Sequence, residues 1–115
     1  MRFEKIGNIK AAWYEGAPLT SEREAIEVIG ETYGQDVDLV VLPAELLPDD
    51  FFWLSTGIAG AVLQKFQNYG FRVAIVGDFV RFTTESPSLR DFVHESNMRG
   101  QTLFLADRAE LEARL

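Results

Sequence analysis

The chain has 115 residues, a length that fits one domain spanning residues 1–115. Its hydrophobic content of 47% suffices for an ordinary globular core, and the absence of cysteine excludes disulfides and thiolate metal sites. A single histidine also excludes a multi-histidine metal site within one chain, so we expect neither a metal nor a cofactor. The net charge of −7 and the scattered basic residues argue against nucleic-acid binding, which depends on contacts to phosphates.

The N-terminal residues, MRFEKIGNIK, lack the apolar stretch of a secretory signal. No other part of the sequence approaches the ~20 consecutive apolar residues of a membrane-spanning helix. We therefore expect a cytoplasmic protein that does not interact with a membrane.

Five strands are predicted, and three of them are continuous apolar runs. Residues 2–6 and 9–14 are β-prone and form a hairpin about Gly7-Asn8, a pair that suits a tight turn with positive φ. The apolar run at residues 38–42 is typical of a strand that is covered on both faces. The same pattern recurs in two later segments, residues 72–77 and 102–106.

The first helix is predicted directly after the hairpin. Thr20 or Ser21 can cap its start, and Gly34 ends it. Apolar residues recur inside it at helical spacing and predict one buried face, made of Ala25, Ile26, Val28, Ile29 and Tyr33.

Three further helices are predicted. The second spans about residues 57–69 and has an apolar face that packs on a sheet. The third begins at Ser86-Pro87, a cap followed by proline at the first helical position, and runs to about Arg99. Asp107 can cap a short helix at the C-terminus.

The predicted order of elements is β-β-α-β-α-β-α-β-α. Strands that alternate with helices imply right-handed crossovers and a mainly parallel sheet, to which the hairpin adds an antiparallel strand. The fold class is therefore α/β, with a mixed, mainly parallel sheet and an N-terminal hairpin in a single domain.

Three long blocks of the sequence carry a specific resemblance: TGIAGAVLQKFQNY, VAIVGDF and SLRDFVHESN. Together they resemble an uncharacterised bacterial family, domain-of-unknown-function family 4180. The resemblance covers most of the chain. It implies no established activity.

The segment Leu54-Ser55-Thr56-Gly57-Ile58 opens a helix, and the apolar strand Ala74-Ile75-Val76-Gly77 follows it. This arrangement resembles, more distantly, STAS domains, the fold of anti-sigma-factor antagonists, in which Asp-Ser-Ser/Thr-Gly-Leu-Gly opens the corresponding helix. Leu54 replaces the aspartate, and the next glycine is displaced from position 59 to Gly60. The resemblance implies a STAS-like fold in which Ser55 matches the serine that a partner kinase phosphorylates.

The start of the second helix is the first candidate site, for an anion or for phosphorylation. A helix N-terminus offers unpaired amides and about half a positive charge, which stabilise a phosphate or carboxylate. The alternative is structural: a hydroxyl caps the helix, and glycines allow close approach of helix and strand. The residues concerned are Ser55, Thr56, Gly57 and Gly60.

The carboxyl ends of the strands are the second candidate site, because ligands of open α/β sheets gather there. Asp78 follows a buried strand, and Arg90, His94 and Asn97 share one face of the third helix. They are candidates for binding a ligand, Arg90 and His94 for gripping an anion. The alternative is that Asp78 stabilises its own loop and that the helix face is solvated. No residue is predicted to be catalytic.

The segment of residues 43–55 is expected to be irregular, because its prolines interrupt regular hydrogen bonding. It contains four bulky apolar residues in succession, Phe51, Phe52, Trp53 and Leu54. Such residues are candidates for contact with a protein partner or with a second copy in a homodimer. The alternative is that they belong to the core.

The outer face of the second helix is poor in charge. Amide side chains dominate it, and the residues are Gln64, Lys65, Gln67 and Asn68. This composition is less typical of a solvated surface, and it also indicates an interface.

Two functions remain open. The first is a non-enzymatic, STAS-like regulatory or protein-interaction domain that presents residues 51–60 to a protein partner or to itself, with Ser55 as a phosphorylation switch. The second is a protein that binds a small anion, or a small enzyme, which uses the crevice around Asp78, Arg90 and His94.

Overall fold

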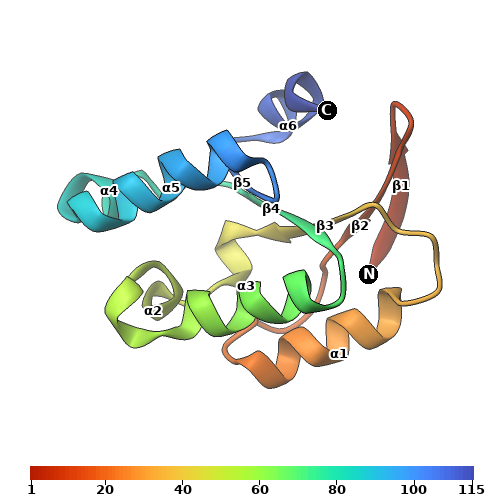
Figure 1. The fold of residues 1–115 in the computed structure, drawn as a ribbon, viewed down its shortest axis with the longest axis horizontal. Helices are drawn as coiled ribbons and strands as arrows, with labels where there is room; N and C mark the ends of the chain where they lie inside the picture. The colour runs from red at the N-terminus through yellow and green to blue at the C-terminus, as the bar shows by residue number, and fades with distance from the viewer.

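The computed structural model describes all 115 residues, and its elements follow the predicted alternation of strands and helices (Figure 1). The strands are β1 (Arg2–Ile6), β2 (Ile9–Trp13), β3 (Leu39–Pro43), β4 (Arg72–Val76) and β5 (Thr102–Leu105). The helices are α1 (Glu22–Thr32), α2 (Asp49–Phe52), α3 (Ile58–Asn68), α4 (Val80–Glu85), α5 (Pro87–Arg99) and α6 (Arg108–Arg114). Two 3₁₀ turns lie between β3 and α3, η1 (Ala44–Leu46) and η2 (Leu54–Thr56).

The strands lie side by side in chain order, β1-β2-β3-β4-β5. β1 pairs with β2 in an antiparallel manner, and the other three pairings are parallel, with Val40 opposite Val73 and Ala74 opposite Leu103. Each crossover moves to the next strand in the same direction, so right-handed crossovers bring their helices to one face of the sheet. The predicted α/β class, with its mainly parallel sheet and N-terminal hairpin, is confirmed.

Buried side chains form a separate core on each face of the sheet. On the helix face, Val40, Ile75 and Phe104 pack with α1, α3 and the start of α5. On the other face, Leu103 and its neighbours pack with Leu111 of α6, which lies across the sheet from α1 and α3 (Figure 1). Successive strand residues point to opposite faces, so two covered faces require the continuous apolar runs seen in the sequence.

The buried face of α1 differs from the prediction. Ile26 and Tyr33 are exposed, whereas Thr32 is buried and its hydroxyl lies 3.0 Å from the carbonyl oxygen of Val28. Successive residues of a helix point about 100° apart. The face of α1 that packs between the sheet and α3 is too narrow to include Ile26, whose side chain is therefore exposed. The buried residues are Ala25, Val28, Ile29 and Thr32.

The structure adds two short helices that no sequence pattern predicted. α2 has four residues and lies in the segment that was expected to be irregular, and α4 has six residues and precedes Ser86. Neither helix is long enough to show a helical period. In α4, Val80, Thr83 and Thr84 are β-branched and have low intrinsic helix propensity, so local preference also gave no signal.

The predicted ends of the last two helices are confirmed. Ser86 Oγ accepts a hydrogen bond from the Leu89 amide at 3.2 Å, and Gly100 ends α5 with a φ of +82°. Asp107 accepts a hydrogen bond from the Glu110 amide at 2.9 Å and caps α6. The longest helix, α5, has 13 residues, and none of the helices combines the length and apolarity that crossing a membrane requires.

Candidate functional site

The two hydroxyls that precede α3 have different environments. The Thr56 hydroxyl lies 2.7 Å from the carbonyl oxygen of Asp50 and 2.9 Å from that of Trp53, and it accepts a hydrogen bond from the Ile58 amide at 3.3 Å. Ser55 is exposed, and its hydroxyl has no hydrogen-bond partner in the chain. Thr56 therefore holds the turn together, while the hydroxyl of Ser55 is free.

The glycines of this turn have distinct roles. Gly57 caps α3 with a φ of +79°, a conformation that residues with a side chain rarely adopt. Gly60 lies within the helix, and a β-carbon there would meet no atom within 4 Å. The expectation that these glycines allow close approach of helix and strand is therefore wrong. Of the first amides of α3, that of Ile58 donates to Thr56, and those of Ala59 and Gly60 have no acceptor within the helix.

The exposed face of α3 is a line of small or uncharged residues, which we call the α3 stripe: Gly57, Gly60, Gln64 and Gln67. The one charged residue of the helix, Lys65, points to α1 and pairs with Glu22 at 3.1 Å. Of the predicted amide-rich face, Lys65 thus belongs to a helix–helix contact. The amides of Gln64 and Asn68 are hydrogen-bonded to each other at 2.8 Å.

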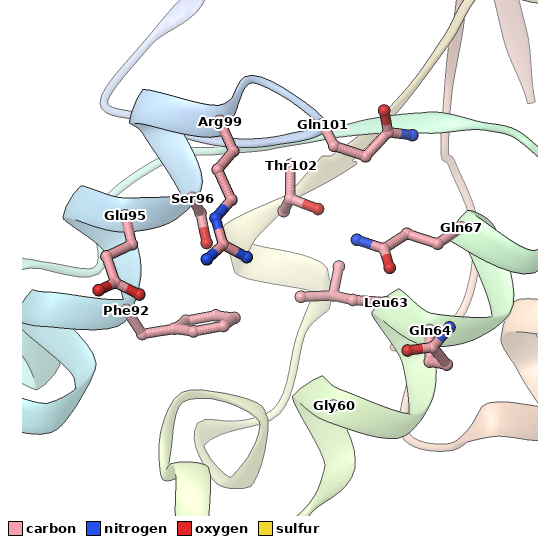
Figure 2. A pocket seen from close by; sticks show the side chains of 10 residues that line it. All are labelled: Gly60, Leu63, Gln64, Gln67, Phe92, Glu95, Ser96, Arg99, Gln101 and Thr102. Carbon is pink, nitrogen blue, oxygen red and sulfur yellow. The ribbon is translucent and has the colours of Figure 1, made fainter.

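A groove of about 210 Å³ lies between α3 and α5 (Figure 2). Gly60, Leu63, Gln64 and Gln67 line it from α3, and Phe92, Glu95, Ser96 and Arg99 line it from α5. Gln101 and Thr102 close it at the start of β5. Three of the four residues of the α3 stripe therefore also border this groove.

Sequence reasoning found only part of the groove. Gln64 and Gln67 were singled out as an amide-rich face, whereas Arg99, Gln101 and Thr102 were not considered. The groove forms where two separate crossovers, β3-α3-β4 and β4-α5-β5, lie side by side. A groove between two elements leaves no motif or periodic pattern in the sequence of either one. The lack of charge on α3 was the one sequence feature that indicated it.

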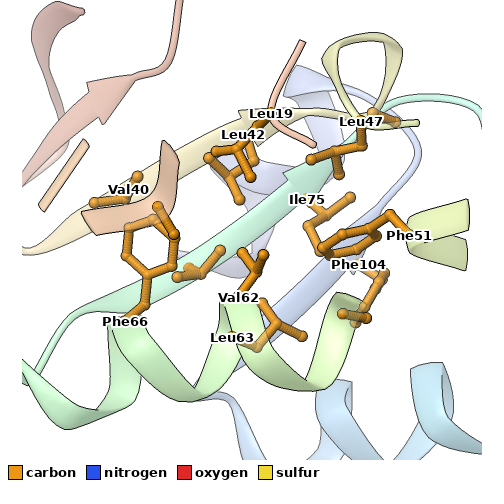
Figure 3. Close-up of a cluster of buried hydrophobic side chains, with 14 of the residues drawn as sticks. Leu19, Val40, Leu42, Leu47, Phe51, Val62, Leu63, Phe66, Ile75 and Phe104 are labelled. Atoms are coloured by element: carbon orange, nitrogen blue, oxygen red, sulfur yellow. The ribbon is translucent and has the colours of Figure 1, made fainter. Parts of the chain in front are cut away.

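Aromatic side chains fill the space between α2 and α4, near the N-terminal end of α3. Phe51 and Phe52 are only 1% and 2% exposed, and the Phe52 ring stacks on Phe82 with a centroid distance of 4.8 Å. Figure 3 shows Phe51 packed in the same cluster as Phe104. Phe51 and Phe52 are therefore core residues and cannot form the interface predicted for them. Trp53 and Leu54 are half-buried and keep some surface.

The residues predicted for a ligand at the carboxyl ends of the strands do not come together. Asp78 accepts a hydrogen bond from the Val80 amide at 3.1 Å and stabilises its own loop. Asn97 is hydrogen-bonded to both backbone groups of Phe104, at 2.8 and 3.1 Å. Arg90 and His94 are exposed, and no hydrogen bond or ion pair joins them to Asp78. No three His, Asp or Glu side chains gather closely enough to hold a metal ion.

A hollow of about 460 Å³ does lie at this edge, where β2, β3 and β4 end in Trp13, Pro43 and Val76. Asp78, Arg90 and His94 do not line it. The guanidinium groups of Arg2 and Arg108 lie 5.3 and 5.4 Å from the centre of the Trp13 ring. The polar groups at this edge are thus different from the predicted ones.

Of the charged residues that line this hollow, Arg108 is paired within the chain. Arg108 contacts Glu4 at 2.7 Å and Glu112 at 2.9 Å. The hydrogen bond from Arg108 holds the pKa of Glu4 below its ordinary value, and the two carboxylates raise the pKa of Arg108. Trp13 Nε1 is buried and has no hydrogen-bond partner. Arg108 therefore has little positive charge left for a ligand.

Comparison with known proteins gives one family. Residues 7–115 match the family model described as Domain of unknown function (DUF4180). No curated protein matches the chain, and no solved structure does. The match extends from the turn of the hairpin through α6, so it includes the whole parallel sheet and the groove between α3 and α5.

Proposed function

The chain belongs to this domain-of-unknown-function family, DUF4180, and we propose that it is a non-enzymatic protein-interaction domain of STAS-like type. Its contact surface is the α3 stripe together with Ser55. The observation that supports the proposal is the exposed, uncharged face of α3 in a chain with a net charge of −7.

The composition of the α3 stripe favours contact with a protein. Charged residues make up 25% of the chain, yet the stripe contains none. Depletion of charge is the compositional signal of the central part of protein interfaces. The glycines keep the helix surface flat, so a partner can approach the backbone. Trp53, half-buried at the same end of α3, is of a residue type enriched at interface hot spots.

Ser55 supplies a switch for this surface. Its free hydroxyl lies two residues before the cap of α3, close to the amides of the first turn. A phosphate there adds about −1.5 to −2 charges beside the positive end of the helix dipole and changes an otherwise uncharged surface. The hairpin followed by parallel α/β units also agrees with the chain order of STAS domains, in which the matching serine is phosphorylated.

Site-specific photo-crosslinking tests the surface. A photoreactive amino acid is placed at Gln64 in one variant and at Glu31, an exposed residue of α1, in a matched control. After irradiation in the cells that make the protein, we expect a discrete protein adduct from position 64 only. An adduct of twice the chain mass of 13.0 kDa identifies a second copy as the partner. No adduct from position 64, or the same adducts from both positions, contradicts the proposal.

The switch is tested with Ser55→Asp and Ser55→Ala in the crosslinking variant. We expect Ser55→Asp to change the yield or the identity of the adduct, whereas Ser55→Ala retains the wild-type pattern. Ser88→Asp adds the same charge to the exposed first turn of α5 and serves as the control. If Ser55→Asp gives the wild-type pattern, Ser55 is not a switch, although the interaction surface still stands.

A further inference from the structure

The groove between α3 and α5 contains polar groups without partners in the chain, among them Thr102, Arg99 and Gln67. Thr102 is only 6% exposed, yet its hydroxyl makes no hydrogen bond and faces the groove (Figure 2). Its oxygen is not among the fully buried polar atoms that lack a partner, so it is open to water or to a ligand in the groove. Arg99 and Gln67 extend into the groove from opposite walls, and neither has an ion pair or a side-chain hydrogen bond.

Arg99 faces the groove and makes no ion pair. Lys65, Arg81 and Arg108 all pair with carboxylates at 2.6–3.1 Å. Glu95 lies one turn before Arg99 on α5 and also lines the groove, but the two make no ion pair. The positive charge of Arg99 is therefore left for an anion from outside.

The remaining amides of the groove are already engaged. Gln64 Nε2 donates to Asn68, and Gln101 Nε2 donates to the carbonyl oxygen of Phe71 at 3.0 Å. The free donors are thus the guanidinium of Arg99, the amide of Gln67 and the hydroxyls of Ser96 and Thr102. Leu63 and Phe92 supply apolar surface beside them.

We propose that this groove binds the carboxylate of a small monocarboxylic acid. Arg99 and Gln67 grip the carboxylate from the two walls, the Thr102 hydroxyl donates from the floor, and Leu63 and Phe92 contact the apolar body. A guanidinium matches the planar, bidentate geometry of a carboxylate. A single cation with Glu95 nearby suits a monoanion better than a phosphate dianion. A groove of about 210 Å³ is small for a drug-sized ligand and fits a small acid.

Titration of the ¹⁵N-labelled protein, followed by NMR, tests the site. The probes are benzoate, its neutral analogue benzamide, and the blocked peptide acetyl-Ala-Glu-Ala-amide, which represents an acidic side chain of a protein. We expect benzoate to shift the resonances of Gln67, Arg99 and Thr102 to saturation. Benzamide and the peptide bind at least about tenfold more weakly, as expected when a charged hydrogen bond or the apolar contact is lost.

Variants localise the binding. Arg99→Gln and Gln67→Ala change exposed residues, so we expect both to fold and to weaken benzoate binding at least about tenfold and about threefold, respectively. Arg90→Gln removes another exposed arginine from the same helix, outside the groove, and is expected to retain the wild-type affinity. Thr102→Val removes the floor hydroxyl with little change of volume and weakens binding about tenfold.

Three results would overturn the assignment: no saturable shift with benzoate, equal affinity of Arg99→Gln and wild type, or tighter binding of the peptide than of benzoate. The acid site goes beyond the proposed interaction surface and has a separate readout. Arg99→Gln leaves the α3 stripe unchanged, so acid binding can fail while the crosslink from position 64 persists, and the reverse also holds.

Discussion

Gly77 lies where two segments of the chain come close together. Its φ is +143°, and a β-carbon at this position would lie 2.8 Å from the β-carbon of Ala44 in η1. Gly60 differs in both respects, because it has a helical conformation and open space around it. The two glycines therefore form a matched pair for a substitution by alanine.

We expect Gly77→Ala to lower the free energy of unfolding by about 1–3 kcal/mol, because the added methyl group forces η1 away from β4. Gly60→Ala should raise it by up to about 1 kcal/mol, because alanine is the better helix former. Urea denaturation followed by circular dichroism measures both. Equal stability of the two variants would contradict the close contact at Gly77.

Glu24 fixes the start of α1. Its carboxylate accepts hydrogen bonds from the Ser21 hydroxyl at 2.7 Å, from the Thr20 hydroxyl at 2.8 Å and from both backbone amides. These bonds favour the ionised form, so they hold the pKa of Glu24 below its ordinary value of 4.5. A carboxylate with a lowered pKa stabilises the fold above the pKa of the unfolded chain, and this contribution is lost as the pH falls through the folded-state value.

Glu24→Gln is therefore expected to be less stable than the wild type at neutral pH. The difference in the free energy of unfolding should shrink as the pH falls below 4.5, because the wild-type carboxylate also becomes protonated. Urea denaturation at a series of pH values measures this difference. A difference that stays constant down to the acid limit would show that the charge of Glu24 does not stabilise the cap.

At the scale of elements, the short helices α2 and α4 hold an aromatic cluster together. Phe52 of α2 stacks on Phe82 of α4 and on Phe79 just before it, with interplanar angles of 10° and 13°. Trp53 meets the edge of Phe82 at a centroid distance of 5.2 Å. These rings join the segment before α3 to the segment before α5, so they fix the positions from which both groove-forming helices start.

Phe52→Ala should lower the free energy of unfolding by about 3–5 kcal/mol, the usual cost of removing a buried phenylalanine ring. Phe3→Ala is the matched control, because Phe3 is 42% exposed, and its effect should stay below about 1 kcal/mol. Thermal or urea unfolding measures both variants. A small effect of Phe52→Ala would place Phe52 at a surface, as the interface prediction required.

The strands and the longer helices could be predicted because their signals are local. Continuous apolar runs mark strands covered on both faces, and Ser86-Pro87 and Gly100 mark the ends of α5 within a few residues. The faces of the elements were harder to predict, as the exposed Ile26 and Tyr33 show. Which apolar residue is buried depends on the neighbouring elements, and this information is not local.

The candidate site could be predicted only in part for the same reason. The helix start at Ser55 and the amide-rich face of α3 were visible as patterns within one element. The free hydroxyl of Ser55, as opposed to the engaged one of Thr56, depends on the turn formed by η2. Arg99 and Thr102 face Gln67 only because three elements meet at the groove, which the sequence does not reveal.

At the scale of the whole molecule, the helices are distributed unequally. α1, α3 and α5 cover one face of the sheet, whereas α6, with seven residues, is the one helix packed on the other. Leu111 of α6 is fully buried against that face. The second core therefore depends strongly on a single short helix.

Leu111→Ala is expected to lower the free energy of unfolding by about 2–5 kcal/mol, through lost burial and the cavity left behind. Leu115→Ala removes a leucine that is 36% exposed, just beyond the same helix, and should cost much less. Urea denaturation compares the two variants. Similar losses would mean that the C-terminal segment packs as a whole and not through Leu111.

The central claim is that the uncharged α3 stripe is a protein-binding surface, and native mass spectrometry of the protein purified from its own cells tests it most directly. The wild type is compared with Gln64→Arg, which adds a charge to the stripe, and with Glu31→Arg, which places the same side chain on exposed α1. The account predicts a bound protein, either another chain or a second copy, on the wild type and on Glu31→Arg but not on Gln64→Arg. A complex that survives Gln64→Arg unchanged, or a wild-type chain that carries no protein, would contradict it.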